Sequence, residues 1–280
     1  HDNIGLYRTE QFVNDGGAGN ARPYYNGYYS DREGNQKAAN HVVMLRNTSK
    51  GHSLYTTFQL QKNFVDGILK GLYLNGSYSF GQSRGVTDGT SSVATSAWKY
   101  RAALDGNAEE VGYTAGSFDG RLLLSASYTA NWSKYAATSF GLIYQRYRPF
   151  RYSYCYNGDA NGDSQFSNDL MYIPANFDEV KDHLLPGDFD SQEDAWKAMN
   201  AFIEQDPYLS KHRGEYAERN GAVAPFANQL DLSVSHDIKI YQKNGRSHTL
   251  RFSFNIANFL NLLNRNWGVV QTTVLGNQQY

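Results

Sequence analysis

Pairs of segments in which apolar and polar residues alternate constrain the fold of this chain more than any other feature. Residues 53–63 and 71–84 form the first pair, and a turn sequence with Asp66-Gly67 lies between them. The residues on the more apolar side of the first segment are Leu54, Thr56, Phe58 and Leu60. Since successive side chains of an extended chain point to opposite faces, this period of two predicts a hairpin of two antiparallel strands.

Two further pairs of segments repeat the alternation. They are residues 121–129 with 138–148 and residues 226–240 with 248–257. The last pair is joined through Asn244-Gly245, a dipeptide that favours the tight turn of a hairpin. The sequence therefore predicts six antiparallel strands, and residues 41–47 are a weaker candidate for a seventh.

The connections between these segments have two lengths. Those inside the hairpins are short and lie near residues 64–70, 130–137 and 241–247. Those between hairpins, residues 85–120 and 149–225, are long and rich in Gly, Asp, Asn and Ser. Short turns at one end of the strands and long loops at the other are typical of outer-membrane β-barrels. Because the inside of a soluble β-sandwich is dry, the polar strand faces also favour a transmembrane barrel with a hydrated lumen over a sandwich.

Composition agrees with a β-rich chain and excludes two other classes. The 280 residues include 22 Tyr, 15 Phe and 26 Gly, which favour strands and turns. No apolar run approaches the ~18 residues of a spanning helix. A mean hydropathy of −0.61 is compatible with a barrel, whose alternating strands average out as hydrophilic. Lys and Arg number 26 against 27 Asp and Glu, so no cationic excess favours binding to nucleic acid.

The strands are too few for the barrel that the loops suggest. Loops of this length belong to large barrels, and the plugged transporters have about 22 strands. Six or seven strands would leave two unpaired edges in lipid, where every backbone polar group needs a partner. We therefore expect the chain to supply part of a larger barrel. A small complete barrel is the alternative, and the intact mass of the natural protein distinguishes the two.

Several blocks of the sequence resemble one protein family. The blocks are VVMLRNTSKGHS (42–53), YSFGQSRGVTDGTSSVATSAW (78–98), YNGDANGDSQFSNDLMYIP (156–174), QDPYLSKHRGEYAERNGAVAPFANQLDLS (205–233) and FNIANFLNLLNRNWG (254–268). Over about residues 40–270 the chain is similar to TonB-dependent receptors of Bacteroidetes. Within them it resembles the Oar-like (OmpA-related) group, which has a carboxypeptidase-regulatory-like N-terminal domain.

The resemblance implies the C-terminal segment of a 22-stranded outer-membrane barrel, in which the six strands are the sixteenth to twenty-first. The family's N-terminal plug and TonB box would lie outside this chain. The implied function is active uptake of a scarce ligand, driven by TonB and the inner-membrane proton-motive force. The implied partners are TonB with its energising complex, outer-membrane lipid, an unknown transported ligand and, by analogy with related importers, a surface lipoprotein.

A short acidic motif in the second long loop predicts a cation site. Oxygen ligands at alternate positions, with a glycine that permits the turn, are how a short loop surrounds Ca²⁺. The sixth and twelfth positions of an EF-hand loop would be Gly and an acid, but they are Ser164 and Leu170 here. The candidate ligands of this shortened variant are Asp159, Asn161, Asp163 and Asp169. A plain Asp/Asn/Gly turn is the alternative interpretation.

The same loop predicts a helix over residues 191–205. Ser191 followed by Asp194 resembles a capping box. The apolar stripe of this helix consists of Trp196, Met199, Phe202 and Ile203. We expect the helix to pack against a small core of the loop itself, and a lid over a ligand is the alternative.

The common signatures of metal-dependent and nucleotide-dependent catalysis are missing from the sequence, and we expect no enzyme. There is no His-Glu-x-x-His, phosphate-binding glycine loop or dinucleotide fingerprint. The single cysteine, Cys155, allows no internal disulfide, and we expect an ordinary thiol. The residues expected to face the lumen are Tyr55, Gln59, Tyr73, Asn75, Asp231 and Arg251, and those expected at a membrane interface are Tyr128, Trp132 and Tyr135. The rival function is a soluble, calcium-stabilised β-sandwich that serves as an adhesin or glycan-binding module.

Overall fold

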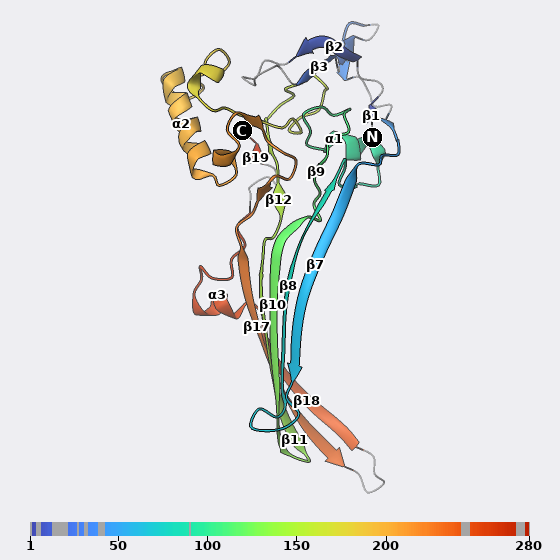
Figure 1. Cartoon of the computed structure of the whole chain (residues 1–280), viewed down its shortest axis with the longest axis vertical. Helices are drawn as coiled ribbons and strands as arrows, with labels where there is room; N and C mark the ends of the chain where they lie inside the picture. The colour runs from blue at the N-terminus through green and yellow to red at the C-terminus, as the bar shows by residue number, and fades with distance from the viewer. Residues whose placement is uncertain are drawn as a thin grey trace.

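A computed structural model of the chain describes residues 2–3, 7–12, 22–26, 28–30, 33–38, 43–89, 91–241, 247–272 and 278–279. The described chain is mostly β, with an antiparallel sheet and few helices, which confirms the predicted fold class at that level. It forms a long, narrow sheet that carries a folded region at one end (Figure 1). We call the sheet the shaft and the folded region, built from residues 86–117 and 148–226 together with residues 22–26, the head.

The shaft is one antiparallel sheet of six long strands. They are β7 (Gly51–Asn63), β8 (Leu72–Gly85), β10 (Phe118–Ser133), β11 (Ala136–Tyr147), β17 (Ala227–Tyr241) and β18 (Ser247–Ile256). The spatial order is β18-β17-β11-β10-β8-β7, and the short β9 (Gly112–Tyr113) adds to β8. Each of the six lies where the alternating segments place a strand. Every long strand pairs with its neighbour in the chain, so the sheet is a simple meander.

The pairing register places the apolar residues of all six strands on one face. Thr56 lies opposite Phe80, Phe58 lies opposite Tyr78, and Tyr78 in turn lies opposite Leu122. The same register continues through β11, β17 and β18. Residues directly opposite each other in a sheet share a face, so the alternation of each strand becomes a continuous apolar face and a continuous polar face.

Tight turns join the strands at the end of the shaft far from the head. Gly71 closes the turn between β7 and β8 with a φ of +91°, and its N–H donates to the carbonyl of Phe64. A Cβ at this position would lie 2.9 Å from the carbonyl oxygen of Thr129, so only glycine fits without a shift of the backbone. The Asn244-Gly245 turn lies outside the described residues.

The predicted seventh strand over residues 41–47 is not part of the shaft. Only β6 (Val43–Met44) is extended in a ladder there, and it pairs with β1 (Asp2–Asn3). Residues 45–50 have no strand assignment, and residues 41–42 lie outside the described part of the chain. The alternation of apolar and polar residues in this stretch is too short to form a further strand at the edge of the sheet.

The head is built from short elements. It contains α1 (Ala94–Lys99), β12 (Arg151–Tyr152), β13 (Tyr154–Cys155), β14 (Tyr172–Ile173), η1 (Phe177–Glu179), α2 (Gln192–Gln205), η2 (Leu209–Lys211), β15 (Glu215–Tyr216) and β16 (Ala222–Val223). β12 pairs with β16 and β14 pairs with β15. The head also includes β3 (Pro23–Asn26). The remaining short elements are β2 (Tyr7–Phe12), β4 (Tyr28–Ser30), β5 (Gln36–Ala38), α3 (Phe259–Leu263) and β19 (Gln278–Gln279).

A small hydrophobic core holds the head together. Its fully buried members include Tyr154, Ile173, Ile203 and Leu209. The helix expected over residues 191–205 is α2, whose first turn is capped by the Ser191 hydroxyl, and it contributes Ile203 together with Met199 and Phe202 to this core. Among the described residues no helix is long and apolar enough to cross a membrane.

Candidate functional site

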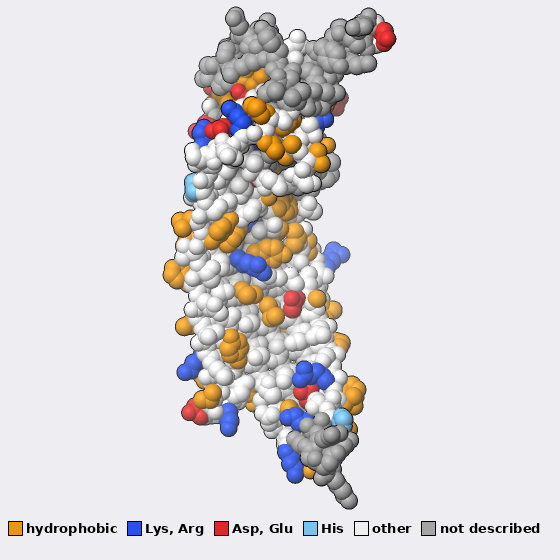
Figure 2. All heavy atoms as spheres, turned by 90° about the vertical axis from the view of Figure 1, so that its right-hand side faces the viewer, with side chains coloured by type: hydrophobic (Ala, Val, Ile, Leu, Met, Phe, Trp, Pro, Cys, Tyr) orange, Lys and Arg blue, Asp and Glu red, His pale blue; other side chains and the backbone are white. Residues whose placement is uncertain are grey.

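The apolar face of the shaft is uncovered over most of its length. Figure 2 shows hydrophobic side chains along the shaft. The exposed fractions are large: 80% for Leu60, 65% for Phe58 and 65% for Phe254. Other members of this face that are exposed are Leu54, Phe80, Leu124, Phe140, Leu142, Val234, Leu250 and Phe252. Soluble monomers rarely expose an apolar patch of this extent, which therefore marks a surface that contacts protein or lipid.

The opposite face of the shaft is polar, and its side chains are hydrogen-bonded across the strands. The pairs are Thr57–Ser79 at 2.9 Å, Gln59–Asn75 at 2.8 Å, Tyr73–Gln61 at 3.3 Å, Thr129–Ser139 at 3.0 Å and Gln145–Gln229 at 2.9 Å. Arg251 forms a two-pronged ion pair with Asp237, at 2.6 and 2.7 Å. Such a ladder is stable next to water and would be costly against a hydrophobic layer, so this face suits a hydrated space.

The residues that the sequence placed toward the lumen lie on this polar face. Gln59, Tyr73 and Asn75 take part in the ladder, and the Tyr55 hydroxyl donates to the carbonyl of Gly116. Asp231 accepts a hydrogen bond from Gln229 and another, of 2.7 Å, from the backbone N–H of Asn258. These contacts are made within the wall of the sheet, and none of them by itself defines a binding site.

The two outer strands of the shaft each have one unpaired side. Among the described strands, β7 pairs only with β8 and β18 pairs only with β17. Each therefore presents a row of free backbone N–H and C=O groups over 13 and 10 residues respectively. Long uncovered edges of this kind recruit further strands.

The head brings the four predicted calcium ligands together. Asn161, Asp163 and Asp169 are almost completely buried. Their oxygens accept backbone N–H groups of the same loop: Asp159 from Asp163 and Ser164, Asn161 from Asp163, Asp163 from Gln165, and Asp169 from Ala160, with distances of 2.8 to 3.0 Å. These bonds fold residues 159–169 into a compact acidic loop, as Asx turns do. We call it the acidic loop.

Burial of this negative charge perturbs the carboxyl groups. Burial, followed by the charge of Asp169, raises the pKa of Asp163 to about 7. Burial also raises the pKa of Asp169 to about 6, although the Arg22 guanidinium acts in the opposite direction. Burial raises the pKa of Asp159 as well. The loop therefore holds more negative charge than its neighbours compensate.

One cation of the chain does reach the acidic loop. Arg22 is completely buried, and its Nη1 lies 2.8 Å from Oδ1 of Asp169. The same guanidinium donates to the carbonyl of Leu170 and lies over the rings of Tyr156 and Tyr216. No local pattern predicts this pair, because the two residues are 147 positions apart.

Calcium binding by the acidic loop stays a prediction. In the part of the chain that the structure describes, no three His, Cys, Asp or Glu side chains are arranged to hold a metal ion. The carboxylates are turned toward backbone N–H groups and Arg22 instead. Three carboxylates and one guanidinium nevertheless leave a net negative charge, which a divalent cation would neutralise. Hard oxygen donors are also the ligands that Ca²⁺ prefers.

Cys155 lies in the head beside the acidic loop and is inert by its environment. It is completely buried, packs with Ala102 and Leu170, and its pKa is raised by burial and by the charge of Asp169 to about 12. Because only the thiolate reacts, we expect no labelling by a maleimide at pH 7 while the head is folded. Rapid labelling of the native protein would contradict this packing.

Comparisons with known proteins give no relative for this chain. No protein-family model, no curated protein and no solved structure matches it.

Proposed function

We propose that the chain forms part of the barrel wall and the extracellular loops of a TonB-dependent transporter in the bacterial outer membrane. In this proposal the apolar face of the shaft contacts lipid and the polar face lines a hydrated lumen. The head is the extracellular end, where two long loops fold together. Ligand capture by the loops would be followed by TonB-driven rearrangement of a plug and passage through the lumen.

The observation that carries the proposal is a single sheet that is apolar on one face, polar on the other and uncovered over most of its length. A soluble β-sandwich buries its apolar face under a second sheet, and the described residues place no such layer over β7, β8, β10, β11, β17 or β18. A lipid-facing wall needs no cover. Further strands pairing with β7 and β18 would satisfy the two edges and close a barrel of about 22 strands.

The ends of the shaft support the orientation. Trp132 and Tyr135 are 67% and 48% exposed next to the tight turn between β10 and β11. Tyr128 lies on the apolar face of β10, four residues before Trp132. Exposed aromatic side chains at this level fit the girdle that anchors a barrel at the periplasmic interface. Short turns would then be periplasmic and the head extracellular.

Extraction tests the proposal. We expect the full-length protein to stay in the outer-membrane fraction after washes with high salt and alkaline carbonate, and to be released only by detergent. The physical reason is the exposed apolar face, because its contact with water would be unfavourable once the lipid is removed. Release without detergent as a monodisperse protein would instead favour the soluble adhesin or glycan-binding module.

We propose that the acidic loop holds one Ca²⁺ that stabilises the head. Two buried carboxylates, Asp163 and Asp169, and the half-buried Asp159 opposite one guanidinium support this proposal. We expect a chelator to shorten the lifetime of residues 149–225 against a protease, and Ca²⁺ to restore it. Asp163→Asn should abolish the response to Ca²⁺, whereas Asp178→Asn, an exposed change in the same loop, should leave it intact. An unchanged lifetime in chelator would refute the site.

A further inference from the structure

Four arginines gather at the head end of the apolar face. Arg84 on β8 and Arg151 on β12 lie 4.3 and 4.1 Å from the centroid of the Tyr113 ring. Arg146 and Arg148, at the end of β11, lie 4.4 and 4.2 Å from the centroid of the Phe226 ring. Two aromatic rings therefore each hold two guanidinium groups. We call these four arginines the arginine belt.

The strand register fixes the face on which the belt lies. Arg146 is opposite Leu122, and Arg84 is opposite Tyr113. By the alternation of β8, Arg84 shares its face with Phe80. The belt thus continues the apolar face at the point where the shaft meets the head, on the side away from the polar ladder.

The belt has an excess of positive charge. Asp119 pairs with Arg151 and lies 3.6 Å from Nε of Arg148, and Glu218 pairs with Arg84. Two carboxylates are thus the acidic partners of a group of four guanidinium ions, which leaves a net positive charge. Arg146 is exposed and forms no ion pair in the described part of the chain. Like charges held this close are stabilised by an anion, and the exposed guanidinium of Arg146 is able to donate to one.

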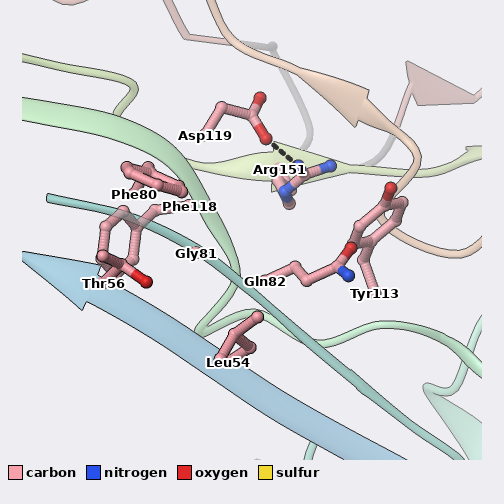
Figure 3. A pocket seen from close by; sticks show the side chains of 9 residues that line it. All are labelled: Leu54, Thr56, Phe80, Gly81, Gln82, Tyr113, Phe118, Asp119 and Arg151. Carbon is pink, nitrogen blue, oxygen red and sulfur yellow. Dashed lines mark hydrogen bonds and ion pairs between the residues drawn. The ribbon is translucent and has the colours of Figure 1, made fainter.

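A pocket joins the belt to the apolar strands. It has a volume of about 300 Å³, and Figure 3 shows Arg151 and Asp119 in it, with Tyr113 to one side and Phe80 and Thr56 to the other. Leu54 completes the apolar wall. A ligand that lies here meets the guanidinium of Arg151, which is paired with Asp119, toward the head, and apolar side chains toward the shaft. That combination matches an amphiphile with an anionic headgroup.

We propose that the arginine belt binds the phosphorylated headgroup of a lipid in the outer leaflet, whose acyl chains lie along the apolar face. This inference rests on the proposed function, because it requires the apolar face to contact lipid. Guanidinium groups bind phosphate through two parallel hydrogen bonds and keep their charge at every physiological pH. The rings of Tyr113 and Phe226 hold the arginines in place before the lipid arrives, which lowers the entropic cost of binding.

Lipid binding by the full-length protein in a nonionic detergent tests the inference. The probes are lipid A with its phosphate groups and the same lipid A after removal of the phosphates, and the readout is the Kd from native mass spectrometry. We expect the phosphorylated lipid to bind at least tenfold more tightly. Arg146→Gln should weaken its binding about tenfold, because one charge-assisted contact is lost, and Arg146→Gln with Arg148→Gln should weaken it further. Binding of the dephosphorylated lipid should not change.

A matched control lies on the other face of the sheet. Arg121 donates to Gln145 on the polar face, so Arg121→Gln removes an arginine from the same shaft and should leave lipid binding unchanged. Equal affinity for the two lipids, or an Arg146→Gln variant that binds like the wild type, would overturn the inference. So would inorganic phosphate alone binding as tightly as the lipid. A protein that still requires detergent but fails these tests would leave the proposed function standing.

Discussion

In buffer with a chelator, Arg22→Gln is expected to destabilise the head by about 3–5 kcal/mol, since removal of one partner leaves the other charge buried and unpaired. Arg22 and Asp169 are both buried and lie 2.8 Å apart. Glutamine keeps much of the side-chain volume but supplies no charge to a loop that already contains three carboxylates. The head should therefore open far more often than it does in the wild type.

The single cysteine makes this opening measurable. Cys155 is completely buried in the folded head and pairs with Leu170 next to the acidic loop. Maleimide labelling under native conditions follows the open population, so a loss of about 3–5 kcal/mol corresponds to labelling faster by a factor of about 100 or more. The measurement is the rate of maleimide labelling of Cys155 in buffer with a chelator.

Two variants separate the buried pair from general effects of charge. Lys197→Gln removes an exposed cation that pairs with Asp194 on α2, and it should leave the labelling rate close to that of the wild type. Arg22→Gln combined with Asp169→Asn removes both buried charges and should recover part of the lost stability. An Arg22→Gln head that labels as slowly as the wild type would show that the ion pair contributes little.

The shaft was predictable because its information is local. Alternation within residues 53–63 and 121–129 identifies β7 and β10, and Asp66-Gly67 marks the turn after β7. The pattern missed the beginning of β10, where the pairing with β8 shifts between Phe118 and Arg121. A bulge interrupts the period of two, so an alternation pattern starts only after it.

The head was predictable only where a signal is local. The Ser191 cap and the apolar stripe locate α2, and the spacing of Asp159, Asn161 and Asp163 locates the acidic loop. Arg22, which immediately precedes β3, depends on a contact across 147 positions and leaves no trace in composition or periodicity. Trp98, almost completely buried on α1, was likewise hidden in a loop rich in small polar residues.

The arginine belt did have a signal in the sequence. Along β11 the apolar face runs through Leu142 and Tyr144 and then continues with Arg146 and Arg148 at the same period of two. A face that changes from apolar to cationic toward the long loops is the pattern expected where a lipid-facing wall meets charged headgroups. The partners of these arginines, Tyr113 and Phe226, come from other loops and could be identified only from the structure.

Leu124→Arg is expected to destabilise the protein by about 2–4 kcal/mol in a bilayer, the cost of a lipid-facing arginine near the midplane of a barrel. Leu124 lies near the middle of β10 on the apolar face and is 42% exposed. In water an arginine at so exposed a position would cost little. The size of the loss in stability therefore shows whether this face contacts lipid or water. The measurement is the free energy of unfolding in lipid vesicles, by titration with guanidinium chloride, and the yield in the outer membrane.

Ser125→Arg is the matched control, because it places the same side chain on the next residue and on the opposite face. Ser125 lies between Asn75 and Ile143 on the polar face. If that face lines a hydrated lumen, the new guanidinium stays in water and the free energy of unfolding should change by less than about 1 kcal/mol. The contrast between neighbours is the decisive quantity. Two variants with equal, small effects would mean that both faces meet water, and two variants with equal, large effects would mean that the polar face is buried against protein.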